Sequence, residues 1–208
     1  MHDSCVIVFA RAPVPGATKT RLIPALGAVG AAGLHQRLVE RMLVEAISAA
    51  IGPVELCCTP NTNHPFFADC ALNLGITLHA QIGEDLGARM NGALVRRLTQ
   101  SRTVLLVGSD IPALEARHLR QAKLALDEVD AVFIPAEDGG YVLVGLSQPQ
   151  PWIFSNIPWG SEQVMELTRR RAAEAELRIA VLEPLWDIDQ PDDLARVDPA
   201  LLAGLMRS

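Results

Sequence analysis

Short apolar runs alternate along the chain with longer stretches in which apolar residues recur every three or four positions. The runs have the length and composition of buried strands, and the longer stretches have the period of amphipathic helices. Strands are therefore expected at residues 6–9, 54–59, 76–81, 104–107, 131–135, 141–146 and 178–182. Strands that alternate with helices predict an α/β fold, with a parallel or mixed sheet covered by helices on both faces.

Between these strands, the helical period predicts helices at about residues 31–50, 86–100, 114–126 and 161–175. Asp85 and Ser161 precede two of them and are natural N-caps. Residues 60–70 are expected to form a loop in which His64 is solvated. The run at 141–146 is compatible either with a hairpin or with an antiparallel strand inserted in the sheet.

Length and composition limit the class of protein. A chain of 208 residues suits a single domain, residues 1–208, with its own core. The net charge of −6 argues against a nucleic-acid partner. No apolar run approaches a membrane span, so no membrane partner is expected. The four cysteines show no CxxC spacing and indicate buried thiols in a reducing compartment. We therefore expect a cytoplasmic protein.

A cationic loop follows the first strand. Arg11, Lys19 and Arg21 lie there together with Gly16 and two threonines, in an otherwise acidic protein. Cations, hydroxyl groups and a glycine that lets the backbone approach a ligand suit a phosphate chain. The loop is neither a GxxxxGK[ST] nor a GxGxxG motif. The alternative is an ordinary solvated basic loop.

Acidic side chains follow several of the later strands. Asp110 follows the run at 104–107 after Gly108 and Ser109, Asp138 follows 131–135, and Asp187 and Asp189 follow the last strand. Ligands of open α/β sheets bind at the carboxyl ends of the strands, and carboxylates there suit a divalent cation such as Mg²⁺ or Mn²⁺. Capping or turn formation explains Asp110, Asp138 and Asp189 equally well at this point.

Two further residues are candidates for ligand contacts. Arg89 lies in the first turn of its helix, where a cation is poorly placed for the helix dipole. A ligand contact would explain it, and so would an ion pair with Glu84 or Asp85. Trp159 stands out in a chain with 4% aromatic residues. It could stack on a sugar or base, or cover the sheet.

Four segments in order carry a resemblance to a known family. They are FARAPVPGATKTRL at 9–22, VGSDIP at 107–112, PAEDGGY at 135–141 and WDIDQPDDL at 186–194. Together they resemble the DUF2064 family, described as radical-SAM/selenodomain-associated transferase 1. The resemblance covers nearly the whole chain. It implies a three-layer, Rossmann-like GT-A fold of the nucleotide-diphospho-sugar transferase superfamily, with a mixed, mostly parallel sheet.

The resemblance also implies site residues. Asp110 matches the metal-binding acid of GT-A enzymes, and Asp189 resembles the second metal-side acid of related nucleotidyltransferases. Lys19 and Arg11 resemble their phosphate-binding loop, which Arg21 extends. The sequence departs from the pattern at two places. Ser109-Asp110 stands where glycosyltransferases have DxD, and Pro-Val-Pro-Gly replaces the GxSxRMG-type loop of nucleotidyltransferases.

The first departure requires Asp189 to complete the metal site. The second favours a metal-dependent transferase that moves a glycosyl group from a nucleotide-sugar to a small acceptor. In this hypothesis Asp138, or else Glu137, orients or deprotonates the acceptor, and Lys19 acts on the phosphates. The alternative is nucleotidyl transfer from CTP or GTP to a phosphorylated small molecule, as in the guanylyltransferases of molybdenum-cofactor and coenzyme F420 synthesis. A non-catalytic binding or scaffold protein is the third hypothesis.

Overall fold

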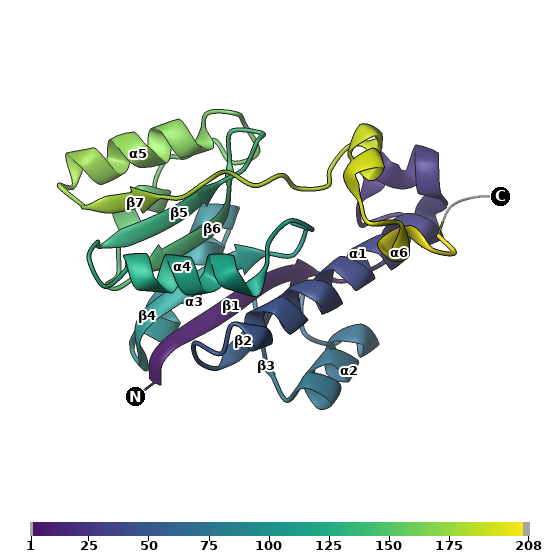
Figure 1. Ribbon diagram of the computed structural model, residues 1–208, viewed down its shortest axis with the longest axis horizontal. Coiled ribbons are helices and arrows are strands. Elements are labelled where there is room, and N and C mark those ends of the chain that lie inside the picture. Colours follow the sequence, from purple (N-terminus) through teal and green to yellow (C-terminus); the bar gives the residue numbers. More distant parts are fainter. Residues whose placement is uncertain (1, 206–208) are drawn as a thin grey trace.

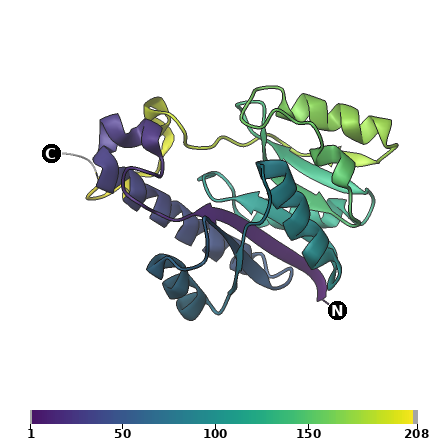
Figure 2. The same ribbon diagram turned by 180° about the vertical axis from the view of Figure 1, so that it is seen from behind.

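The computed structural model describes residues 2–205, which form a seven-stranded sheet with helices on both faces (Figures 1 and 2). The strands are β1 (His2–Arg11), β2 (Val54–Thr59), β3 (Thr77–Ala80), β4 (Ser101–Gly108), β5 (Ala131–Pro135), β6 (Tyr141–Leu146) and β7 (Ile179–Val181). The helices are α1 (Ile23–Ser48), α2 (Pro65–Leu74), α3 (Leu86–Leu98), α4 (Ala116–Ala125), α5 (Val164–Glu174) and α6 (Pro199–Leu202). Short 3-10 helices are η1 (Thr20–Leu22), η2 (Pro151–Phe154) and η3 (Pro191–Arg196).

The sheet is mostly parallel. Its order is β3-β2-β1-β4-β6-β5-β7, so β1 lies near the centre with β2 and β4 parallel on either side. Strand β6 forms a hairpin with β5 and also lies antiparallel between β5 and β4. Both interpretations of residues 141–146 are therefore correct. The predicted α/β class, with a mixed and mostly parallel sheet, is confirmed.

Alternate side chains of each buried strand point to opposite faces, which makes two cores. On β4, Leu105 and Val107 pack with residues of α1, α2 and α4 on one face. Val104 and Leu106 pack with residues of α3, η2 and α5 on the other face. The three layers follow directly from this alternation, because a strand that is apolar on both sides needs a helical cover on both sides.

A third cluster lies beside the sheet and forms a small lobe. The start of α1 contributes Leu26 and Leu34, and the C-terminal segment contributes Ile188 and Val197. In Figure 1 this lobe stands apart from the sheet, and the yellow segment after β7 crosses to reach it. A kink at Gly27, with φ 73°, bends the start of α1 into the lobe. The lobe brings residues 186–190 to the end of β4.

Two helices differ from the predicted boundaries at their N-termini. Helix α1 begins at Ile23 rather than near residue 31, because Gly27 adopts a conformation that joins two helical pieces across the kink. Residues 60–70 are not a loop, because α2 begins at Pro65. The ring of His64 caps this helix by accepting a hydrogen bond from the Phe66 N–H at 3.3 Å.

Of the possible caps, those by Ser161 and Asp189 do not form, whereas that by Asp85 is confirmed. Helix α5 begins at Val164, and Ser161 accepts only a 3.4 Å contact from the N–H of Gln163 within the preceding turn. The N-cap of η3 is Gln190 rather than Asp189. Asp85 does cap α3, since its carboxylate accepts from the Ala88 N–H at 2.7 Å.

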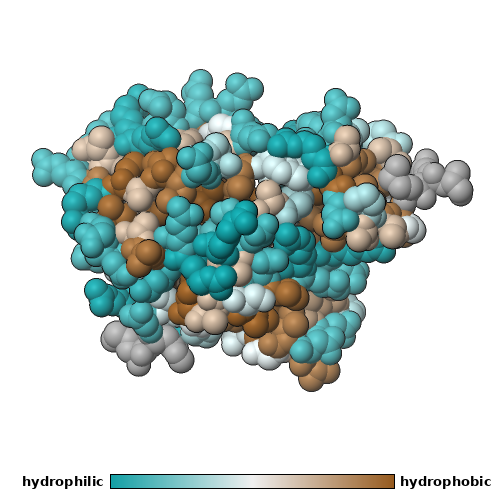
Figure 3. All heavy atoms as spheres, in the orientation of Figure 1, coloured by the Kyte–Doolittle hydropathy of each residue, from teal (hydrophilic) through white to brown (hydrophobic). Residues whose placement is uncertain are grey.

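The face shown in Figure 3 carries apolar residues in separate areas divided by hydrophilic ones. Large exposed apolar side chains include Val29, Leu72, Ile82 and Leu124. Among the described residues, no helix is long and apolar enough to cross a membrane.

Candidate functional site

Two adjoining hollows lie at the carboxyl ends of the parallel strands. The larger has a volume of about 420 Å³ and runs from the ends of β1 and β2 to the β5–β6 turn. The smaller, of about 400 Å³, is lined by the cationic loop. Arg11, His35 and Asp110 line both. The hollows therefore meet at Asp110, at the strand ends where α/β sheets bind ligands.

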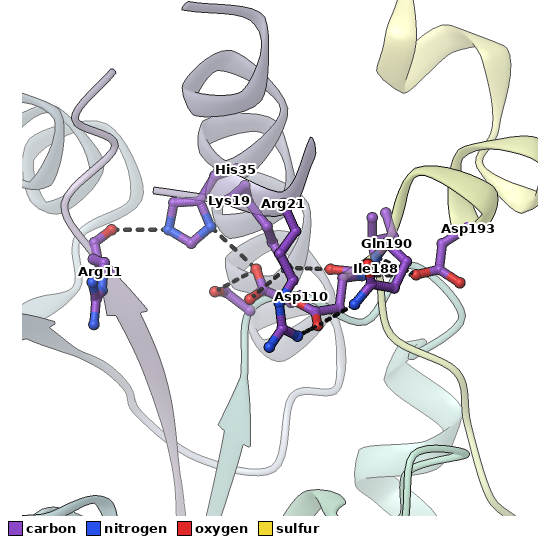
Figure 4. A network of polar contacts seen from close by, with 10 residues as sticks. Arg11, Lys19, Arg21, His35, Asp110, Ile188, Gln190 and Asp193 are labelled. Atoms are coloured by element: carbon purple, nitrogen blue, oxygen red, sulfur yellow. Dashed lines mark hydrogen bonds and ion pairs between the residues drawn. The ribbon is translucent and has the colours of Figure 1, made fainter. Parts of the chain in front are cut away.

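The Asp110 carboxylate is held from two sides (Figure 4). Lys19 Nζ lies 2.9 Å from Oδ2, and His35 Nδ1 lies 3.1 Å from Oδ1. Burial by itself raises the pKa of Asp110, but Lys19 and His35 outweigh it and hold that pKa well below the usual range. Helix α4 has Glu115 as its N-cap. Asp110 therefore does not cap the following helix, and its ionised carboxylate faces the two hollows.

Lys19 is fixed at the meeting point of sheet and lobe. Its side chain is 7% exposed and donates to the Ile188 carbonyl as well as pairing with Asp110. Its backbone is left-handed, with φ 51°. A non-glycine residue in this region carries strain, which persists where surrounding contacts over-determine it. The Ile188 N–H also donates to the Asp110 carbonyl at 2.9 Å, so three contacts hold these segments together.

His35 is the site residue that sequence reasoning missed. It lies on α1 and is buried, with Nε2 2.9 Å from the Arg11 carbonyl oxygen and Nδ1 toward Asp110. A signal was present in the sequence. His35 occupies the i, i+4, i+8 row of Val39 and Leu43, which is otherwise apolar. A polar side chain on the buried face of a helix needs a partner, and here it has two.

Asp189 and Asp187 have different surroundings. Asp189 lines the smaller hollow and pairs with Arg21. Asp187 lines the larger cavity. Burial raises the pKa of Asp187 to about 6, and the nearby Asp138 and Asp110 carboxylates add to the rise. The structure thus brings three carboxylates, those of Asp110, Asp138 and Asp187, to the larger cavity.

Asp138 lies in the turn between β5 and β6 and faces the larger cavity. Its Oδ1 accepts from the Gly140 N–H at 2.9 Å, which confirms the tight turn, and the residue also lines the larger cavity. Glu137 is exposed and pairs with Arg196 at 2.7 Å instead. Of these two acids, only Asp138 faces the cavity.

Gly139 packs closely against the segment that precedes α5. Its φ is +90°, and a Cβ there would lie 2.2 Å from the Glu162 carbonyl oxygen. Its own carbonyl accepts from the Met165 N–H at 2.9 Å. Gly139 therefore lets the β5–β6 turn pack against the start of α5, which positions Asp138.

The remaining predicted cations line the two hollows. Arg11 and Arg89 line the larger cavity, and Arg21 lines the smaller one. Arg89 Nε donates to the Gly83 carbonyl at 3.0 Å, and within residues 2–205 it forms no ion pair with Glu84 or Asp85. Gly16 is exposed, with φ +82°, and lies outside the lining of either hollow.

Trp159 and Tyr141 form an aromatic wall of the larger cavity. Their rings meet edge to face at 6.1 Å, and Tyr141 in turn packs on Phe133 of the core at 5.3 Å. Gly87 makes room for this wall, since a Cβ there would lie 2.7 Å from the Trp159 ring. Trp159 therefore both covers the core and lines the cavity.

Oxygen ligands in the cavity fit a hard divalent cation better than a soft one. In the described part of the chain, no group of three or more His, Cys, Asp or Glu side chains gathers closely enough to form a preformed metal centre. Burial is the main cause of the raised pKa of Asp187, and repulsion by the Asp138 and Asp110 carboxylates adds to it. A cation such as Mg²⁺ or Mn²⁺ would relieve this repulsion, so the carboxylates of the cavity are suited to hold a divalent cation.

Comparison with solved structures places the fold. A candidate nucleotide-diphospho-sugar transferase from Desulfovibrio desulfuricans G20 is 28% identical, with a TM-score of 0.85 and full coverage of both chains. CMP:2-keto-3-deoxy-manno-octonic acid synthetase complexed with CTP is 12% identical, with a TM-score of 0.59 over 97% of this chain and 98% of that one. Rv0371c from Mycobacterium tuberculosis H37Rv, in complex with manganese, is 18% identical, with a TM-score of 0.56 over 98% and 100%. The fold is that of nucleotide-diphospho-sugar transferases.

Sequence comparison gives the family. A search of curated proteins finds no match. A family model, described as an uncharacterized protein conserved in bacteria (DUF2064), matches residues 42–161, which is more than half of the chain. This range contains Asp110, Asp138 and Trp159, whereas the cationic loop and the segment at 186–194 lie outside it. The chain belongs to the DUF2064 family.

Proposed function

We propose that this protein is a metal-dependent transferase that moves a glycosyl group from a nucleotide-sugar to a small acceptor. The observation that carries the proposal is the junction at Asp110. A hollow lined by cations and a cavity lined by carboxylates and aromatic rings open onto the same side chain. The likeness to the Desulfovibrio protein, a candidate nucleotide-diphospho-sugar transferase, supports the choice of donor.

The donor diphosphate would be bound by the cations around Asp110. Arg11, Lys19 and Arg21 line the smaller hollow, and Arg89 lines the cationic end of the larger one. Guanidinium and ammonium groups donate charge-assisted hydrogen bonds to phosphate oxygens. The same contacts strengthen as the nucleoside diphosphate leaves with the bonding electron pair, because negative charge then accumulates on its terminal phosphate.

Asp110 would hold the divalent cation together with a second acid from the segment after β7. The family resemblance indicates Asp189, whereas Asp187 shares the larger cavity with Asp110, so both are candidates for this role. When bound, Mg²⁺ or Mn²⁺ would supply positive charge to the diphosphate. The manganese complex of Rv0371c, which has the same fold, supports this cofactor class.

Asp138 would act on the acceptor. Its Oδ1 is engaged by the Gly140 N–H, which fixes the carboxylate and leaves Oδ2 to accept a proton or a hydrogen bond from the attacking hydroxyl group. The residue lines the cavity that also holds Asp110. A fixed base near the donor phosphates is the arrangement that transfer to a hydroxyl group requires.

A thermal-shift screen of nucleotide-sugars with and without Mn²⁺ tests the proposal. A donor present at 100 times its Kd should stabilise the folded state by about 2.7 kcal/mol. Incubation of that donor with the protein should then release a nucleoside diphosphate. A screen in which no nucleotide-sugar gives a metal-dependent shift would count against the proposal.

Nucleotidyl transfer is the second candidate, and the smaller hollow favours it. That hollow extends beyond Asp110 and carries Lys19 and Arg21, so it offers charge for a leaving pyrophosphate. The CTP-bound synthetase has the same fold. Release of pyrophosphate from CTP or GTP in the presence of sugar phosphates would support this candidate. Binding of nucleotide-sugars alone would support glycosyl transfer.

A further inference from the structure

Cations line one end of the larger cavity, and carboxylates line the other end. We define its cationic half as Arg11, Gln81 and Arg89. Arg11 ends β1, Gln81 follows β3, and Arg89 lies on α3. Its acidic half consists of Asp138, Tyr141, Trp159, Ser161 and Asp187. The strand order separates the halves, because β1, β2 and β3 lie on one side of β4 while β6 and β5 lie on the other.

The acidic half has no cation among its described lining residues. The nearest candidates are already engaged elsewhere. Lys19 pairs with Asp110 and donates to the Ile188 carbonyl at the junction. Arg196 pairs with Glu137 and lies over the Trp186 ring at 4.4 Å, outside the cavity lining. Asp187 lies within the influence of Lys19 at the junction, whereas Asp138 forms no ion pair within residues 2–205. A phosphate group beside Asp138 would therefore face its carboxylate without a cationic partner, which is unfavourable.

The aromatic wall gives this half a second property. Tyr141 and Trp159 present ring surface to the cavity, next to the side chains of Val142 and Val164. Aromatic surface beside carboxylates suits a molecule with an apolar face and hydrogen-bond donors, and the electron-rich ring faces also attract cations. Such a surface offers few donors to a phosphate or carboxylate ligand.

From this placement we propose that the acceptor is a hydroxylated molecule that is uncharged or cationic and carries no phosphate, and that Asp138 determines this specificity. The inference rests on the proposed glycosyl transfer and names its second substrate. The acceptor oxygen forms a bond to the anomeric carbon of the donor, whose bond to the diphosphate oxygen breaks. The acceptor proton passes to Asp138, and the electron pair leaves with the nucleoside diphosphate.

Matched probe pairs test the proposal through binding. The pairs are glucose and glucose 6-phosphate, glucosamine and glucosamine 6-phosphate, and glycerol and glycerol 3-phosphate. Each compound is titrated into the protein with the donor's nucleoside diphosphate and Mn²⁺, and the indole N–H signal of Trp159 is followed by NMR, assigned with Trp159→Phe. The unphosphorylated member of at least one pair should bind at least tenfold more tightly than its phosphate.

A charge reversal makes the test specific to Asp138. Asp138→Lys should reverse the preference within the pair, whereas Glu128→Lys, the same charge change in an exposed turn elsewhere, should leave it unchanged. Tighter binding of phosphorylated probes by the wild type, an unchanged preference in Asp138→Lys, or no saturable shift with any probe would overturn the proposal. If the protein binds nucleotide-sugars with Mn²⁺ but does not show the expected probe preference, the proposed function stands and only the acceptor assignment is wrong.

Discussion

At the scale of single residues, the site depends on how Asp110 is held. Its carboxylate lies between Lys19 and His35, and both come from the first 35 residues of the chain, whereas Asp110 ends β4. A carboxylate fixed by two donors has one orientation, which preorganises it for a ligand. The smaller hollow opens directly beside this group.

Lys19→Met is expected to weaken nucleotide-sugar binding. The substitution removes the charge beside Asp110 but keeps most of the apolar stem. Hydrogen bonds to charged groups contribute about 1.5–3 kcal/mol, so the Kd should rise roughly tenfold to a hundredfold. Isothermal titration calorimetry measures it, with Lys123→Met on the outer part of α4 as the control. An equal Kd for both variants would show that Lys19 does not contact the donor.

At the scale of elements, a buried ion cluster fixes α3 on the sheet. Glu55 of β2 is 4% exposed and pairs with Arg96 at 2.6 Å and Arg97 at 3.2 Å. Both arginines lie in the last turn of α3, whose first turns carry Arg89 and the Gly87 contact with Trp159. The cluster therefore anchors the far end of the helix that lines the cationic half of the cavity.

Glu55→Ala should strongly destabilise the fold. Removal of one partner of a buried ion pair leaves an uncompensated charge and costs roughly 3–5 kcal/mol. Urea denaturation of Glu55→Ala beside Glu128→Ala measures the difference in the free energy of unfolding. A loss below about 1 kcal/mol would mean that water reaches Arg97 and replaces the carboxylate.

The sequence predicts elements well and predicts their long-range contacts poorly. Strands such as β4 were evident because a buried parallel strand is a continuous apolar run. Helix α2 is not predicted because the sequence around Pro65 indicates a loop, although proline is favoured at the first position of a helix. The sequence does not distinguish the surroundings of Asp187 from those of Asp189. The distinction depends on the pairing of Asp189 with Arg21, which lies 168 residues away along the chain. His35 was missed for the same reason, since its partners come from β1 and β4.

At the scale of the whole molecule, the two cores and the small lobe join around the ligand crevice. The sheet supplies Asp110 and Asp138, and the lobe supplies Lys19, Arg21 and the segment with Asp187 and Asp189. The start of α1 and the segment after β7 lie side by side, away from the sheet (Figure 1). The candidate site therefore combines residues from both ends of the chain with those of its central part. None of the four cysteines belongs to it, and all are buried.

The cysteines should be unreactive in the folded protein. Burial raises the pKa of Cys57 and Cys58 to about 12, and that of Cys5 and Cys70 to about 11. At pH 8 the folded thiols are therefore protonated and shielded, whereas unfolded thiols have a pKa near 8.5. A chromogenic disulfide reagent should react only slowly with the native protein. In urea it should react rapidly with all four thiols. Rapid reaction of any thiol in the native state would contradict the packing.

Metal-dependent donor binding by Asp110 tests the central claim most directly. Isothermal titration calorimetry with the best nucleotide-sugar of the screen, with Mn²⁺ and with chelator, is compared between wild type and Asp110→Asn. Unfolding curves without ligand confirm that the variant is folded. We predict tight binding by the wild type only with Mn²⁺, and a loss of at least tenfold in Asp110→Asn. Equal affinity in the two proteins, or binding that ignores the metal, would contradict the account.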